Sequence, residues 1–233
     1  DTPGADAGEE ANANNQAHSI SRLITAMSNI HVPNVGIIFG VGYSGGAIPL
    51  AASNLILSLR DGVFSTIQPM GLASIARRLN LSWQECAKYV GVSAPELHAQ
   101  GNIDAIVDYS PSDSPERIEN LRSAIVGSLI NIESQTSQFV AENPYILDHY
   151  RQSLLRYLAS QSKNSKGPAH SSVAFAGSKN PTEYLNVFGI AYRYMRYLRV
   201  RKRIKATSTK QYGRLAPQEM PSGELHIRAD RER

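Results

Sequence analysis

The pattern of apolar and polar positions divides the first part of the chain into short apolar runs separated by glycine-rich or polar turns. The run that begins Val35-Gly36-Ile37-Ile38 is rich in β-branched residues and predicts a buried strand. Further short strands are expected at Leu55–Leu59, Phe64–Ile67 and Ile103–Val107. Asp61-Gly62, between two of these runs, is typical of a tight turn.

Helical spacing of apolar residues alternates with these strands. Helices are expected at Gln16–Asn29, at Leu72–Leu79, after the capping residue Ser82, and at Ala94–Gln100, where Gly101 ends the helix. Because strands alternate with helices, the pattern predicts an α/β layered domain.

The pattern becomes helical from Ser114 onward. Ser114-Pro115-Glu116 combines a cap, a proline in the first turn and an acid, and predicts a long helix to about Ala141. Asn143-Pro144 breaks it, and a second helix is expected from Tyr145 to Ser160.

These signals predict four regions and a longer parent protein. We expect an α/β core at residues 1–113, its C-terminal helices at 114–160, a linker at 161–180 and a basic, tyrosine-rich helix and tail at 181–233. Asp1-Thr2-Pro3-Gly4-Ala5 resembles a loop that leaves a buried strand. We therefore expect the core to be truncated at its N-terminus.

Composition and charge narrow the class of protein. The chain has 42% hydrophobic and 19% charged residues, without the run of roughly 18 apolar residues that a membrane helix needs. Cys86 is the only cysteine, which predicts a reducing, cytoplasmic setting and no disulfide framework or thiolate metal cluster. Residues 1–180 hold 12 Lys/Arg against 15 Asp/Glu, whereas residues 181–233 hold 12 against 5. The net charge of +4 therefore comes from the C-terminal end.

The most informative stretch for chemistry is Gly40-Val41-Gly42-Tyr43-Ser44-Gly45-Gly46-Ala47, which follows the first strand and precedes a short apolar helix. A strand, a glycine turn and a helix direct several backbone N–H groups at one point, at the positive end of the helix dipole. Such a point can hold a phosphate or stabilise a developing oxyanion, and glycines let a ligand approach the backbone. A tight turn with close packing and no ligand explains the same glycines.

A serine hydrolase is one alternative, because Gly42-Tyr43-Ser44-Gly45-Gly46 matches the G-x-S-x-G nucleophile elbow. The Ser44 hydroxyl would then be the nucleophile, although it can also serve as a helix cap. Triad partners would come from the downstream residues His98, His149, His170, His226, Asp104 and Asp108. A five-residue pattern is weak, and no feature of the sequence distinguishes one of these histidines.

Several motifs in residues 1–160 together resemble the α subunit of bacterial acetyl-CoA carboxylase carboxyltransferase. Gly40–Ala47 resembles the family's G-E-G-G-S-G-G-A, and Thr66–Ile75 resembles its V-I-S-P-E-G-C-A-S-I. Gly91–Leu97 and Ile103–Val107 are similar to its G-I-T-A-P-R-L and L-I-D-S-I-I. The order and spacing of the motifs are kept, whereas residues 161–233 have no recognised counterpart.

The resemblance implies both a fold and a reaction. The fold is the crotonase-like α/β fold of the ClpP/crotonase superfamily, a superhelix of ββα turns with added C-terminal helices. The reaction moves a carboxyl group from carboxybiotin on a biotin carboxyl carrier protein to acetyl-CoA, giving malonyl-CoA for fatty acid biosynthesis. A β-type subunit would complete a hetero-oligomer by binding the acyl-CoA thioester, and no metal is expected in this chain.

The same resemblance assigns residues to the biotin side of the reaction. The backbone amides of Gly45 and Gly46 are the implied oxyanion donors. The residues implied around the biotin are Gly40, Gly42, Tyr43, Ala47, Pro69, Met70 and Gly71. Val41, Tyr43 and Met70 depart from the family pattern, because they replace Glu, Gly and Glu. A second alternative is therefore a non-catalytic paralogue that binds or regulates a carboxyltransferase partner.

The basic tail predicts a docking helix from Pro181 to Lys205. Its apolar stripe consists of Tyr184, Val187, Phe188, Ala191, Tyr194, Met195 and Leu198. Arg193, Arg196, Arg199 and Arg203 lie mostly off this stripe. We expect the stripe to dock on a partner, while the arginines contact an acidic partner surface or the phosphates of CoA. Binding of nucleic acid is a distant second reading.

Overall fold

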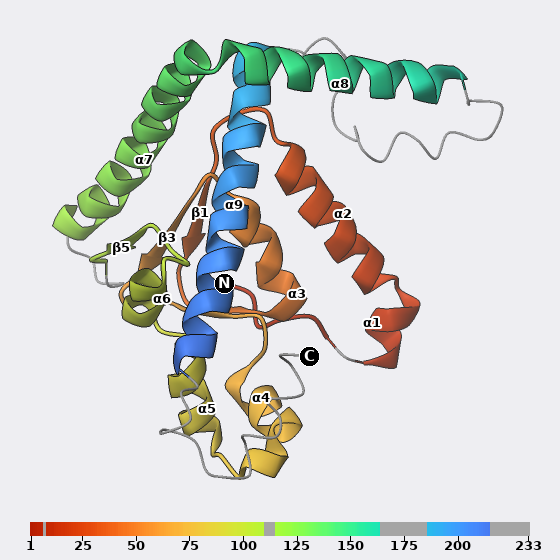
Figure 1. Cartoon of the computed structure of the whole chain (residues 1–233). Helices are drawn as coiled ribbons and strands as arrows, with labels where there is room; N and C mark the ends of the chain where they lie inside the picture. Colours follow the sequence, from red (N-terminus) through yellow and green to blue (C-terminus); the bar gives the residue numbers. More distant parts are fainter. Residues whose placement is uncertain (7, 110–114, 164–185, 215–233) are drawn as a thin grey trace.

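The computed structural model describes residues 1–6, 8–109, 115–163 and 186–214 (Figure 1). Its strands are β1 (Val35–Ile38), β2 (Val41–Tyr43), β3 (Leu55–Leu59), β4 (Val63–Ser65) and β5 (Ala105–Val107). The first ββα unit is β1, β2 and a helical run of α3 (Ser44–Ala47) and η1 (Ile48–Ala52). A second ββα unit consists of β3, β4 and α4 (Pro69–Ile75).

The two units stack in register through parallel strand pairs. One sheet has the order β1-β3-β5, with Val35 opposite Leu55, and the other pairs β2 with β4. All five residues of β3 are buried, which explains why four of them are apolar; the fourth residue of the strand, Ser58, donates its hydroxyl to the Leu59 carbonyl at 3.0 Å. Stacked ββα units with parallel strands and added C-terminal helices confirm the predicted fold class.

Several predicted elements are found where the sequence placed them, and one strand was missed. α2 (Gln16–Asn29), α6 (Ala94–Gln100) and β3 have the expected bounds. The single strand expected before the glycine turn is two strands, because the chain leaves β1 at Phe39 and enters β2 in another sheet. The turn at Asp61-Gly62 forms, with the Gly62 N–H donating to the Leu59 carbonyl at 2.9 Å. Its flanking strands β3 and β4 nevertheless belong to different sheets.

The remaining helices surround these sheets. They are α1 (Glu9–Ala13), η2 (Arg77–Leu79), α5 (Trp83–Val90), α7 (Pro115–Glu142), α8 (Pro144–Lys163) and α9 (Val187–Arg214). α7 packs Leu121 and Ala124 against Leu57, Leu59 and Val107 of the three-stranded sheet. α4 and α5 form a lobe at one end of the molecule, and α8 extends away at the other.

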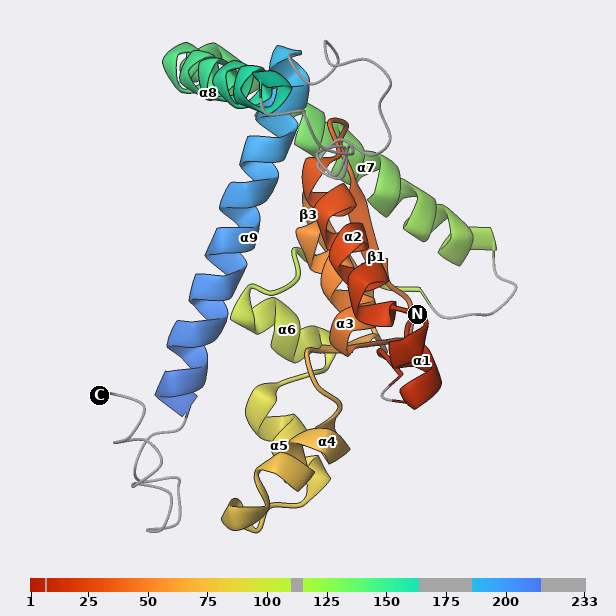
Figure 2. The same ribbon diagram turned by 90° about the vertical axis from the view of Figure 1, so that its right-hand side faces the viewer.

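α9 runs beside the three-stranded sheet, between α2 and α7 in Figure 1, and lies along the same side of the sheet in Figure 2. Ile190 and Ala191 are fully buried against Leu147 of α8, with Phe139, Val140 and Tyr150 around them. Residues 164–180 of the expected linker lie outside the described residues, and 161–163 continue α8. The four-region division of the chain stays a prediction. No helix in the described ranges is long and apolar enough to cross a membrane.

Candidate functional site

The glycine turn joins β2 directly to a helical run. Tyr43 ends β2 in an extended conformation, and Ser44 begins α3 with a positive φ of 54°. In the ordinary α-helical pattern the N–H of Ala47 is the first to meet an intrahelical carbonyl, that of the cap Tyr43. The N–H groups of Ser44, Gly45 and Gly46 therefore have no partner within the helix, and they lie at its positive end. This arrangement can stabilise negative charge on a ligand oxygen.

Packing within the chain explains why Gly45 and Gly46 are glycines. A Cβ on Gly45 would lie 2.9 Å from Cδ1 of Ile20 in α2. On Gly46 it would lie 3.0 Å from Thr2 Oγ1 and 3.5 Å from the carbonyl carbon of Gly4. The sequence attributed the small side chains to ligand approach, but their Cβ directions face α2 and the first residues of the chain.

The first residues form an extra strand-like layer beside β2. The Thr2 N–H donates to the Val41 carbonyl at 2.7 Å, and the Tyr43 N–H donates to the Thr2 carbonyl at 3.0 Å. The Asp1 carboxylate accepts the Val41 N–H at 2.8 Å and would lie 3.2 Å from a Cβ on Gly40. The segment thus fixes the strand that carries the turn.

Gly42 has a packing role as well. A Cβ there would lie 3.1 Å from the Phe64 ring and 3.4 Å from the Ala47 side chain. Gly42 and Ala47 are buried, so these predicted biotin-site residues hold the turn against β4.

The start of α4 reaches the same N-terminal segment. The Gln68 side-chain amide donates to the Pro3 carbonyl at 2.8 Å, which ties the residue before Pro69 to the segment that covers Gly46. Pro69 is buried, whereas Met70 is 65% exposed, and a Cβ on Gly71 would lie 3.3 Å from Ile67. Residues 2–4 therefore contact both the glycine turn and the start of α4, which are far apart in the sequence.

A cavity of about 280 Å³ lies elsewhere, and none of the nine predicted site residues is among its lining residues. Its walls come from β1, β3, β4, η1, α5, α6 and α9, and include Ile38, Phe64, Leu97 and Arg203. Thr66, Gly91, Leu97 and Ile103, which belong to three of the family-like motifs, also line it, although the sequence assigned none of them to a binding site.

The serine hydrolase alternative gains no support from the described residues. There, the Ser44 hydroxyl makes no hydrogen bond to a histidine, and His98 and His149 are exposed. His170 and His226 lie outside the described residues. Asp108 pairs with Arg60 at 3.2 Å, and Asp104 is bound by arginines.

Arg196 of α9 is the largest fully buried side chain among the described residues and was not predicted to be a core residue. Its guanidinium donates to the carbonyls of Ser28, Ile30 and Val32 at 3.2, 2.7 and 3.1 Å. It also donates to the side-chain oxygens of Asn34 at 3.1 Å and Asn54 at 2.9 Å. Burial, with repulsion from Arg193, lowers the pKa of Arg196 to about 10.

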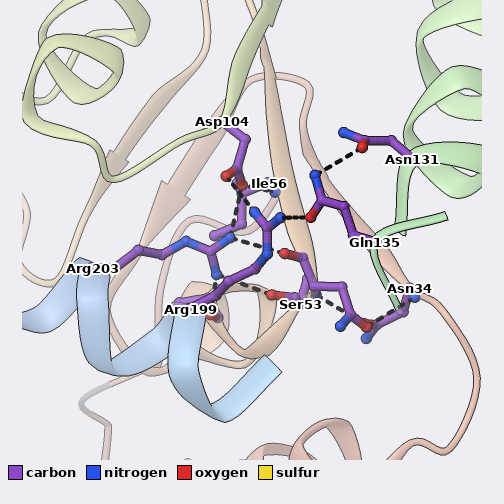
Figure 3. Close-up of polar contacts among 10 residues, drawn as sticks. Asn34, Ser53, Ile56, Asp104, Asn131, Gln135, Arg199 and Arg203 are labelled. Atoms are coloured by element: carbon purple, nitrogen blue, oxygen red, sulfur yellow. Dashed lines mark hydrogen bonds and ion pairs between the residues drawn. The ribbon is translucent and has the colours of Figure 1, made fainter. Parts of the chain in front are cut away.

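Arg203 and Arg199 bind the carboxylate of Asp104 (Figure 3). Arg203 lies 2.8 Å from one carboxylate oxygen and also donates to the carbonyls of Ala51 and Ser53 at 3.2 and 3.0 Å. Arg199 lies 3.1 Å from the other oxygen and donates to Gln135 of α7 at 2.6 Å. Burial lowers the pKa of Arg203, and the charge of Asp104 partly opposes this shift.

The prediction for the arginines of this helix was wrong, because Arg193, Arg196 and Arg203 are buried against the chain's own core. Of the apolar stripe, Ala191 is fully buried within the chain, whereas Val187, Phe188 and Leu198 are 39 to 44% exposed and Tyr184 lies outside the described residues. Docking of the exposed stripe on a partner stays a prediction. Polar acceptors in the core decide the orientation. A local signal was available: α9 contains nine Lys or Arg residues and no Asp or Glu, so its cations need partners elsewhere.

Comparison with known proteins identifies the family. The family model "Acetyl co-enzyme A carboxylase carboxyltransferase-like" matches residues 1–150. The α subunit of acetyl-coenzyme A carboxylase carboxyl transferase from Paramagnetospirillum magneticum is 41% identical over 107 residues, covering 46% of this chain and 34% of the relative. The α subunit from Streptococcus equi subsp. zooepidemicus is 31% identical over 144 residues, covering 62% and 56%. A beta/alpha protein from Clostridium tetani is 32% identical over 130 residues, covering 56% and 23%.

Among solved structures, transcarboxylase 12S with methylmalonyl-coenzyme A and methylmalonic acid bound has a TM-score of 0.48 and 14% identity, over 57% of this chain and 27% of that one. The chain belongs to the acetyl co-enzyme A carboxylase carboxyltransferase-like family, because the family model covers more than half of it. It spans between about a quarter and just over half of the length of these three curated relatives.

Proposed function

We propose that this chain is an α-type component of a biotin-dependent carboxyltransferase that acts on an acyl-CoA, with acetyl-CoA as the preferred substrate. The observation that carries the proposal is the family match over residues 1–150, which includes the complete glycine turn. The turn supports it physically, because both carboxyl donor and acceptor develop negative charge on an oxygen during transfer.

The chain's part in the reaction is to hold an oxygen through backbone N–H groups. Carboxybiotin, presented by a carrier protein, would supply the activated carboxyl group. Gly45 and Gly46 would donate to its ureido oxygen, and we include the Ser44 N–H and leave out the Ala47 N–H because only the first three N–H groups of α3 lack a partner within the helix. One donor of this kind contributes about 3 kcal/mol to transition-state stabilisation. The donors keep their protons, so the turn needs no acidic or basic side chain.

The reaction also needs donors for the thioester oxygen of the acyl-CoA. We propose that a β-type subunit provides them in a hetero-oligomer in the cytoplasm. The Clostridium tetani relative, named for both beta and alpha subunits, supports a close association of the two parts.

A non-catalytic paralogue is the second candidate. Val41 and Met70 are 37 and 65% exposed at positions where the family motif carries glutamate, so two surface carboxylates near the turn are replaced by apolar groups. Such a protein would bind the partner without turnover.

The test mixes the full chain with a carboxyltransferase β-type subunit and measures malonyl-CoA decarboxylation that depends on added biotin. We expect activity in the complex, and Ser44→Ala should keep most of it because only the Ser44 backbone N–H takes part. A stable complex without turnover of any acyl-CoA would establish the paralogue instead. Covalent labelling of Ser44 by a fluorophosphonate, abolished in Ser44→Ala, would overturn the proposal in favour of a hydrolase.

A further inference from the structure

α9 holds two elements beside the glycine turn. One is the helical run α3–η1, which begins at the turn, and the other is α2, which packs against it. From Ser44 to Ala52 the chain is helical without interruption, so the turn is the N-terminus of a run whose C-terminus is the end of η1. At that C-terminus the Arg203 guanidinium donates hydrogen bonds to the carbonyls of Ala51, Ser53 and Asn54, the last at 3.4 Å. A cation at a helix C-terminus satisfies orphan carbonyls and complements the helix dipole.

α2 is held in the same way. Ile20 of α2 packs against Gly45, where an added Cβ would lie 2.9 Å from its Cδ1. At the C-terminal end of α2, Arg196 binds the carbonyls of Ser28, Ile30 and Val32. α2 and α3–η1, the two elements beside the donor N–H groups, are therefore both fixed by arginines of α9.

The arginines of α9 are themselves bound to the three-stranded sheet through Asp104. Asp104 accepts the Ile56 N–H of β3 at 2.7 Å and binds both Arg203 and Arg199 (Figure 3). Arg199 reaches Gln135 of α7. Arg203 thus links the end of η1 to Asp104, which is bound to β3 directly and to α7 through Arg199, so the Arg203 head group has little freedom to move.

We propose that Arg203 and Arg196 are positioning residues for the backbone amides of the glycine turn. This role rests on the proposed carboxyl transfer, in which the two arginines touch neither biotin nor acyl-CoA. They set the position of α3–η1 and α2, and through these helices the direction of the N–H groups at Ser44, Gly45 and Gly46. Both arginines lie outside residues 1–150, so a segment beyond the family match supports the family's own motif.

A guanidinium is needed because each arginine serves several acceptors at once. Arg203 binds three carbonyls and a carboxylate, and Arg196 binds three carbonyls and two amide oxygens. A lysine keeps the charge but has one nitrogen, which cannot span these acceptors. The lysine variant therefore separates charge from geometry.

The experiment compares Arg203→Lys and Arg203→Gln with the control Arg201→Gln, which changes an exposed cation on the same helix. All proteins are full length and assayed at a temperature at which circular dichroism shows them fully folded. The first readout is hydrogen exchange at two bonded amides beside the turn, Tyr43 to Thr2 O and Ile48 to Ser44 O. The second is kcat and KM of biotin-dependent malonyl-CoA decarboxylation with the β-type subunit.

We expect both Arg203 variants to exchange these two amides about tenfold faster and to lose about tenfold in kcat, with KM for malonyl-CoA unchanged, whereas the control matches the wild type. A merely structural arginine would lower the melting temperature and leave kcat of the folded enzyme unchanged, which would overturn the proposal. If the wild-type complex shows no carboxyl transfer, the proposed function fails. The exchange of Tyr43 and Ile48 then still decides whether Arg203 positions the turn.

Discussion

Arg196→Met is the sharpest test of how the C-terminal helix is bound to the core. Methionine keeps much of the apolar volume of the arginine stem but removes its head group. The change removes one donor from each of five oxygens, those of the Ser28, Ile30 and Val32 carbonyls and of the Asn34 and Asn54 side chains. The Asn34 and Asn54 oxygens each keep a second donor, the backbone N–H of the other asparagine, at 3.0 and 3.3 Å.

The magnitude follows from two opposing contributions. Hydrogen bonds to a charged group contribute about 1.5 kcal/mol or more each, so five of them contribute about 7 kcal/mol. Burial of the charge and repulsion from Arg193 cost stability, and the fall in the Arg196 pKa from its ordinary value to about 10 corresponds to about 3 kcal/mol. The hydrogen bonds outweigh the desolvation penalty, and we expect Arg196→Met to lower the free energy of unfolding by about 4 kcal/mol.

The assay is urea and thermal unfolding of the full chain, followed by circular dichroism. For a protein of this size the loss corresponds to a fall in Tm of about 10 °C. The matched control is Arg201→Met on the exposed face of α9, which should change stability by less than about 0.5 kcal/mol. If Arg196→Met unfolds at the same urea concentration as this control, the buried guanidinium does not bind α9 to the core.

Three further predictions address the turn, the sheet anchor and a helix cap. Gly46→Ala should destabilise the protein because its Cβ meets Thr2 Oγ1 at 3.0 Å, and Thr2→Gly should restore most of the lost Tm; no rescue in the double variant would contradict the packing explanation. Asp104→Asn should cost about 1–3 kcal/mol in urea unfolding, because Arg203 and Arg199 lose a charged acceptor; equal stability of variant and wild type would argue against the anchor. In α5, hydrogen bonds from the Ser82 hydroxyl and backbone N–H lower the pKa of Glu85 below 4.5. The stabilisation by this ionised cap is therefore complete above about pH 4.5 and is lost as the pH falls through the lowered value, so the Tm difference between wild type and Glu85→Gln should shrink in acid; a constant difference would refute it.

The sequence by itself determined the features that depend on neighbouring residues. α6 begins at the capping box of Ser93 with Glu96 and ends at Gly101, which has a φ of 76°, so both of its ends are encoded within a few positions. The capping box at Ser82 sets the start of α5 in the same way. The motif around Ser44 was also local, which is why the family and the ββα fold class could be inferred without coordinates.

Only the tertiary structure decided the rest, because the partners are distant in the chain. Gly46 must be small because Thr2 packs against it. β1 and β2 are separate strands because β1 pairs with β3 and β2 pairs with β4. The clearest case is Arg196, whose acceptors at Ser28, Ile30 and Val32 lie more than 160 positions away. An arginine off an apolar stripe is normally exposed, and the sequence predicted that these arginines would face an acidic partner surface or the phosphates of CoA. The carbonyls at the C-terminal ends of α2 and η1 draw Arg196 and Arg203 into the core instead. A buried acceptor needs a donor and a buried cation needs several acceptors, and only the folded chain brings these groups together.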